Sequence, residues 1–137
     1  MIFVDSNVLI DYGSQTGEFA GWSRRELALG RVADELATNH VVAAEISARF
    51  DSADFVLEFL GAAGVALKAL DGKSAFRAGQ AHEAYRRAGG PREAILADFL
   101  IGGHAAVLGA RLLTRDRQRF ATYFPELILI TPETEHG

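Results

Sequence analysis

The chain has 137 residues and a formal net charge of −4, and 49% of its residues are hydrophobic. This length and composition suit one ordinary domain with a real core and exclude a disordered tail protein. The absence of cysteine excludes a disulfide scaffold, a thiolate zinc site and thiol catalysis. The acidic balance argues against a broad basic surface for nucleic acids. Twelve of the 14 basic residues are arginine, however, and arginine can bind phosphate locally.

The beginning of the chain shows no targeting segment. Met1 is followed at once by the short apolar run 2–4 and then by Asp5, without a charged leader or a long apolar stretch. The most apolar later run, 95–113, is interrupted by charged and histidine side chains, which argues against a membrane span. We therefore expect a soluble protein of the cytoplasm.

In the first half of the chain, short apolar runs predict strands and longer runs with helical spacing predict helices. In chain order the predicted elements are a strand at 2–4, a helix from residue 8, a helix at 19–37, a strand at 40–42, and helices at 43–50 and 52–63. Asp5, Ser6 and Asn7 are good residues for the start of the first helix. Thr38 and Asn39 are interpreted as the break after the second.

The second half continues the same alternation. The predicted elements are a strand at 65–67, a helix at 71–88, a helix at 95–108, a strand at 112–114, a short helix at 117–123 and a strand at 128–130. Gly64 and Asp71 are expected to end and begin helices. Gly102 and Gly103, inside the apolar helix, indicate close packing of a neighbouring backbone. Residues 131–137 are expected to form a flexible tail.

Strands that alternate with helices predict an α/β fold in a single domain, 1–137. We expect a central parallel sheet of about five short strands between two layers of helices, in a three-layer α/β/α arrangement. In such sheets the functional crevice lies beyond the carboxyl ends of the strands. The polar residues that directly follow each strand are therefore the candidates for a functional site.

Four acidic residues from four segments are candidates for one site. Asp5 follows the first strand and Asp116 follows the fourth, so both are expected at the same edge of the sheet. Asp98 lies inside the most apolar helix, where an unpaired carboxylate is costly. Glu45 lies a few residues after the second predicted strand.

Four carboxylates in one place repel one another, and a divalent cation relieves that repulsion. Oxygen ligands without cysteine or a histidine pair favour Mg²⁺ or Mn²⁺ over zinc. Such a cation could activate water for in-line attack on a phosphodiester.

Each candidate also has a purely structural interpretation. Asp5 and Asp116 could simply cap helices, Glu45 could complement a helix dipole in a first turn, and Asp98 could form an ion pair with an arginine. The polar neighbours Ser6, Asn7 and Thr114 could be hydrogen-bonded groups at a helix start and a strand end. His104 lies on a different helix face from Asp98 and is interpreted as structural.

Two segments of the chain resemble the PIN-domain nucleases. The opening segment IFVDSNVLI, residues 2–10, resembles the first motif of that family. The segment ADFLIGGHA, residues 97–105, followed by LLTRD, residues 112–116, and Phe120, resembles the closing motif. Glu45 lies where the family has its second acid. The size of the chain is most similar to the VapC toxins of type II toxin–antitoxin pairs.

This resemblance implies an endoribonuclease that depends on Mg²⁺ or Mn²⁺. It implies that Asp5, Glu45, Asp98 and Asp116 form the catalytic acidic site, with metal held by Asp5, Asp98 and Asp116 and with Ser6, Asn7 and Thr114 in support. It also implies cleavage of tRNA, rRNA or mRNA, a homodimer, and a small VapB-like antitoxin as partner. Three arginines beside the closing acid are candidates for RNA phosphate contacts or for a solvated helix face: Arg115, Arg117 and Arg119.

Other functions remain open on the sequence alone. A PIN nuclease could act in RNA processing without a toxin role, or a PIN-like scaffold could lack activity. A receiver-like signalling module that binds Mg²⁺ would need a lysine late in the chain, but no lysine follows Lys73.

Overall fold

A five-stranded parallel sheet forms the centre of the protein in the computed structural model, which describes residues 1–90 and 96–134. The strand order is β3-β2-β1-β4-β5, and each neighbouring pair is parallel. The strands are β1 (Ile2–Val4), β2 (Leu36–Asn39), β3 (Val65–Lys68), β4 (Arg111–Leu113) and β5 (Leu129–Ile130). The predicted α/β fold with a parallel sheet is confirmed.

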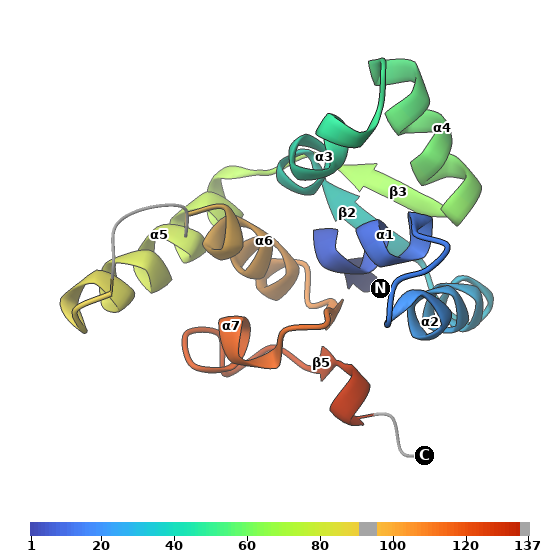
Figure 1. The fold of residues 1–137 in the computed structure, drawn as a ribbon. Coiled ribbons are helices and arrows are strands. Elements are labelled where there is room, and N and C mark those ends of the chain that lie inside the picture. The colour runs from blue at the N-terminus through green and yellow to red at the C-terminus, as the bar shows by residue number, and fades with distance from the viewer. Residues whose placement is uncertain (91–95, 135–137) are drawn as a thin grey trace.

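Helices cover both faces of this sheet (Figure 1). One side carries α1 (Ser6–Gly13), α2 (Ala20–Ala33) and α4 (Ala53–Ala63), and the other carries α5 (Gly72–Arg87), α6 (Leu96–Val107) and α7 (Arg117–Ala121). The short helix α3 (His40–Ile46) follows β2 directly and contacts both α1 and α6. Two short 3₁₀ helices complete the described elements, η1 (Ser47–Arg49) and η2 (Pro132–Thr134).

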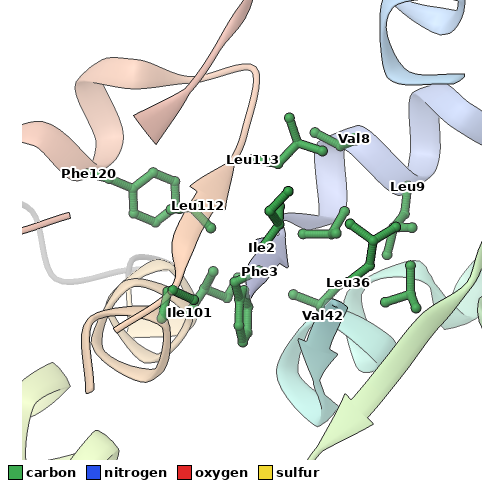
Figure 2. Close-up of a cluster of buried hydrophobic side chains, with 14 of the residues drawn as sticks. Ile2, Phe3, Val8, Leu9, Leu36, Val42, Ile101, Leu112, Leu113 and Phe120 are labelled. Carbon is green, nitrogen blue, oxygen red and sulfur yellow. The ribbon is translucent and has the colours of Figure 1, made fainter. Parts of the chain in front are cut away.

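Successive side chains of each strand point to opposite faces of the sheet, so the hydrophobic core has one half on each face. Phe3 and Leu112 are register partners and share one face of the sheet, toward the helices that carry Ile101 and Phe120 (Figure 2). Ile2 and Leu113 point to the opposite face, where Val8 of α1 lies (Figure 2). All of these side chains are buried. This two-sided core explains why β1 and the Leu112–Leu113 part of β4 are apolar on both faces.

The order of the strands places a topological switch point between β1 and β4. From β1 the chain proceeds outward to β2 and β3, and it then crosses back to β4 and β5 on the other side of β1. The direction of winding therefore reverses between β1 and β4, and ligands of open α/β sheets bind beyond the carboxyl ends of strands at such a point. Asp5 and Thr114 directly follow these two strands.

The predicted strand at 40–42 is wrong, and so is the end of the preceding predicted helix. Helix α2 ends at Ala33, and the second strand is β2, Leu36–Asn39. The Asn39 side chain accepts a hydrogen bond from Val42 N at 3.1 Å and so caps α3. Val41 and Val42, although β-branched, therefore lie in a helix. The cap satisfies the backbone N–H of Val42, which in a strand would need a partner on a neighbouring strand.

The other predicted boundaries agree more closely with the structure. Gly64 ends α4 with a φ of 77°, in the left-handed region that glycine adopts freely. Asp71 caps α5 by accepting from Ser74 N at 2.8 Å. The predicted start of the apolar helix at residue 95 lies outside the described residues. His104 is buried and accepts a hydrogen bond from Asn39 Nδ2 at Nδ1, 3.1 Å away, in agreement with a structural role.

The last residues of the predicted tail lie outside the described part of the chain. Before them, Thr131 is fully buried and η2 follows it, so the chain stays against the domain as far as residue 132. A flexible tail is thus still a prediction for residues 135–137. Among residues 1–90 and 96–134, no helix combines the length and the apolar character that crossing a membrane requires.

The close packing predicted at the glycine pair occurs at Gly103, where α5 crosses α6. A Cβ atom on Gly103 would lie 2.8 Å from Ala78 N and 2.9 Å from Ser74 O, which are backbone atoms. We expect Gly103→Ala to lower the free energy of unfolding by about 1–3 kcal/mol, as overpacking does. Gly79→Ala is the matched control on exposed α5 surface with open space around it, and it should raise that free energy by about 1 kcal/mol. Urea unfolding followed by circular dichroism measures both; equal effects would contradict the packing argument.

Candidate metal and nuclease site

Asp5 forms the buried floor of the candidate site. It caps α1, and its Oδ1 accepts a hydrogen bond from Ser6 N at 2.8 Å, with Ser6 Oγ at 3.4 Å. The residue is fully buried. Burial raises the pKa of Asp5 above its ordinary value, whereas the hydrogen bond from Thr114 and the charge of Arg119 oppose that rise. A buried carboxylate is stabilised by positive charge nearby, so this position suits a cation.

Thr114 connects the ends of β1 and β4. Its hydroxyl donates to Asp5 Oδ2 at 2.7 Å and accepts from Asp116 N at 3.1 Å. Asn7 Nδ2 lies 3.4 Å from the same hydroxyl oxygen, and Asn7 Oδ1 accepts from Arg115 N at 3.1 Å. The polar residues expected beside the site therefore hold the start of α1 against the segment after β4.

Three of the predicted acids are gathered around one arginine. Arg119 Nη1 lies 3.3 Å from Asp98 Oδ1 and 3.7 Å from Asp5 Oδ2, and Arg119 Nε lies 3.3 Å from Asp116 Oδ2. Asp116 also caps α7 by accepting from Arg119 N at 3.3 Å. The helix-cap interpretation of Asp116 and the ion-pair interpretation of Asp98 thus both hold, within the same cluster of charges.

Glu45 lies at the edge of this cluster. It is exposed and belongs to the last turn of α3, so the first-turn dipole interpretation is wrong. A carboxylate near the carboxyl end of a helix faces an unfavourable dipole. Its charge nevertheless reaches Asp98, whose pKa it raises. Helix stability therefore gives no reason for an acid at this position.

The environment of Asp98 favours its neutral form. Its pKa is raised from 3.8 to about 6, chiefly by burial, while the nearby charge of Arg119 opposes the rise. The charges of three neighbouring acids contribute smaller parts of the same rise: Asp5, Glu45 and Asp116. The acidic cluster is thus short of positive charge even with Arg119 in place.

The three arginines proposed for phosphate contacts have different environments. Arg115 is paired with Asp11, with its Nε 2.7 Å from Asp11 Oδ2 and its guanidinium over the Phe19 ring at 5.1 Å, and its side chain is 37% exposed. Arg117 is exposed at the start of α7, whereas Arg119 lies within the acidic cluster. Arg117 is therefore more open than the two paired arginines, and a phosphate contact by any of the three stays a prediction.

Sequence reasoning missed two features of this site. It did not pair Arg115 with Asp11, although Asp11 follows Asn7 by one helical turn and must share its face. It also placed Arg119 toward solvent, although the Asp116 to Arg119 spacing of three residues on a helix is typical of an ion pair.

The donors present fit a hard divalent cation. They are carboxylate oxygens from the ends of β1 and β4 and from α6, and one positive group already lies within 3.7 Å of three of them. In the part of the chain that the structure describes, no three acidic or histidine side chains stand at metal-binding spacing. The side chains would therefore have to close in around a cation.

These features define a class of protein: a parallel α/β domain with an acidic cluster at the topological switch point of its sheet. The family model of the PIN domain matches residues 2–124. The chain therefore belongs to the PIN-domain family, a family of nucleases. A search of curated proteins found no match.

Solved structures show the same fold at low sequence identity. The structure of VapBC2 from Rickettsia felis bound to a promoter DNA fragment aligns with a TM-score of 0.72 and 19% identity, over 96% of this chain and 98% of that one. DNA-bound VapBC from Salmonella typhimurium aligns with a TM-score of 0.71 and 19% identity, over 95% and 96%. FitAcB from Neisseria gonorrhoeae aligns with a TM-score of 0.69 and 18% identity, over 98% of this chain and 99% of that one.

Proposed function

We propose that the protein is a metal-dependent endoribonuclease toxin of a VapBC-type toxin–antitoxin pair. The observation that carries this proposal is the gathering of Asp5, Asp98 and Asp116 around a single positive group beyond the ends of β1 and β4. PIN-family membership supports nuclease activity, and the fold shared with VapBC proteins supports the toxin role. A receiver-like module has no such support.

Each acidic residue has a distinct proposed task. Asp5, Asp98 and Asp116 hold Mg²⁺ or Mn²⁺, while Ser6 and Thr114 orient the Asp5 carboxylate. When bound, the cation supplies positive charge that stabilises the phosphate in the transition state and lowers the pKa of water. Glu45, exposed at the rim, orients the attacking water and accepts its proton.

The exposed rim of the site supports a polymeric substrate. The side chain of Asp116 is 44% exposed, and Glu45 is exposed as well. A separate cavity of about 480 Å³ is lined by other residues, including Leu9, Phe50 and Phe59. A strand of RNA can reach an open rim, whereas a small metabolite would favour a concave, largely apolar cavity.

Partners follow from the same proposal. The chain acts in the cytoplasm as a homodimer and is neutralised by a small VapB-like antitoxin. Support comes from the solved structures of similar fold, several of which are toxin–antitoxin complexes. Light scattering coupled to size exclusion measures the dimer. Growth arrest on induction, relieved by co-expression of a short reading frame adjacent to this gene, measures the toxin role.

A digest of RNA tests the activity directly. Purified protein incubated with mixed tRNA and ribosomal RNA should give discrete fragments with Mg²⁺ or Mn²⁺ and none with EDTA. Intact RNA with both cations would contradict the nuclease proposal. Cleavage without growth arrest would instead favour a PIN nuclease of RNA processing, which leaves the chemistry unchanged and removes the toxin role.

A further inference from the structure

The side chain of Arg119 stands where a cation of the proposed site has to bind. It approaches one oxygen from each of three carboxylates, at 3.3 Å for Asp98 and Asp116 and at 3.7 Å for Asp5. These oxygens come from the end of β1, from α6 and from the start of α7, so α7 alone does not explain the arrangement. The guanidinium acts as the counter-charge of the whole cluster.

These contacts are longer than those of the two arginines with the shortest ion pairs, and they resemble the exposed pair of Arg87 with Glu83 at 3.3 Å. Arg115 meets Asp11 at 2.7 Å, and Arg77 meets Glu126 through two donors at 2.8 and 3.0 Å. The longer distances of Arg119 indicate attraction by charge rather than a bidentate hydrogen-bonded pair. Charge attraction without directional bonds can be replaced by another cation at modest cost.

The position of Arg119 also allows it to leave. Its side chain is 32% exposed, and it projects from α7, a helix of only five residues. Its backbone N–H stays bound to Asp116 Oδ1 at 3.3 Å, so the helix start does not have to move. Rotation of the long side chain toward the rim is therefore enough to free the three carboxylates.

We propose that Arg119 is a resident counter-cation that competes with the divalent metal for Asp5, Asp98 and Asp116. A guanidinium and a divalent cation cannot share these oxygens, because like charges repel and the ligand distances of about 2.1 Å leave no space. Metal binding therefore displaces Arg119 to the exposed rim, where its charge is available to an RNA phosphate. This inference rests on the proposed metal-dependent function.

The competition also explains why the acids stand too far apart for a metal cage within the described residues. A guanidinium holds carboxylates at hydrogen-bond or longer distances, whereas a metal draws them in by about 1 Å. The metal-free protein is thus held in an open arrangement by its own arginine. The free energy of the contacts between Arg119 and the carboxylates is lost when the metal binds, and the affinity for the metal is lowered by that amount.

Binding of Mn²⁺, followed by the electron paramagnetic resonance signal of the free ion, tests this competition. We expect Arg119→Gln to bind Mn²⁺ about tenfold more tightly than the parent chain, because the competitor is gone. Arg117→Gln, on the exposed start of the same helix, removes the same charge and should change the affinity by less than about twofold. Tighter binding by both variants alike would show a general charge effect and overturn the proposal.

Thermal unfolding gives a second readout with a change of sign. In EDTA, Arg119→Gln should melt at a lower temperature than the parent, because three acids lose their counter-charge. In saturating Mn²⁺ the two melting temperatures should become equal, or that of Arg119→Gln should become the higher, because the metal then supplies the missing positive charge. If the glutamine variant does not fold, Arg119→Lys keeps a charge with fewer contacts and should still bind Mn²⁺ more tightly than the parent.

Failure of this inference differs from failure of the proposed function. Equal Mn²⁺ affinity in Arg119→Gln and the parent, with binding lost in Asp98→Asn, overturns the competition and leaves the metal site in place. Equal affinity in Asp98→Asn and the parent overturns the metal site itself. An absence of Mn²⁺ binding in the parent and in Arg119→Gln overturns both.

Discussion

Replacing Asp98 by Asn is expected to abolish RNA cleavage and, in EDTA, to make the protein more stable. The loss of cleavage should reach at least about a hundredfold, because a carboxylate that holds the metal contributes more than the neighbours that orient it. The gain in stability follows from the pKa of Asp98, which burial and the neighbouring acids together raise from 3.8 to about 6. At pH 7.5 the free energy of unfolding should rise by up to about 3 kcal/mol.

The pH dependence of this gain has a definite sign. Above pH 6 Asp98 is charged in both the folded and the unfolded protein, so the folded state carries the full penalty of a buried charge. As the pH falls from about 6 to about 4, the folded protein takes up a proton before the unfolded chain does, and the penalty disappears. The advantage of Asp98→Asn should therefore be large at pH 7.5 and absent near pH 4.

Asp51→Asn is the matched control for this prediction. Asp51 is exposed in the turn before α4, so the same chemical change there should leave cleavage intact and alter stability by less than about 0.5 kcal/mol. RNA cleavage assays and urea unfolding in EDTA at both pH values measure the effects. A variant at position 98 that cleaves RNA at the rate of the parent would remove Asp98 from the site.

The fold was predictable where local signals were unambiguous, and the second strand shows where they were not. The runs around Phe3 and Leu112 are apolar on both faces and short, which is typical of buried parallel strands. Leu36–Asn39 and residues 40–42 are both short and partly apolar, and the spacing of their side chains does not separate them. The hydrogen bond from Val42 N to Asn39 decides between them, and such a cap can be confirmed only in three dimensions.

The candidate site was predictable to a similar extent. The topology of a parallel sheet brings residues that follow strands to one edge, so Asp5 and Asp116 could be placed together from sequence alone. Asp98 was identifiable because a charge in an apolar helix needs a partner. The choice of that partner was beyond the sequence, since Arg119 can reach either solvent or three carboxylates, and the balance depends on distances.

Thr114→Val should weaken both the fold and the metal site, because one hydroxyl group joins three polar partners. The change removes the donor to the fully buried Asp5 Oδ2 and the acceptor for the part-buried Asp116 N, at 2.7 and 3.1 Å. Loss of partners by buried polar groups costs about 1–3 kcal/mol, and more when one of them is charged. We expect the free energy of unfolding to fall by at least about 2 kcal/mol.

The same variant should bind Mn²⁺ about 10- to 100-fold more weakly, because Asp5 loses the group that orients it. The hydrogen bond from Thr114 lowers the pKa of Asp5, so its loss raises that pKa further and makes protons better competitors for the carboxylate. Thr38→Val is the matched control: Thr38 is equally buried in β2, but its hydroxyl donates to the backbone oxygen of Val4 at 2.8 Å and to no carboxylate. It should lose stability and keep its Mn²⁺ affinity, and an equal loss of affinity in both variants would show that Thr114 acts only through general stability.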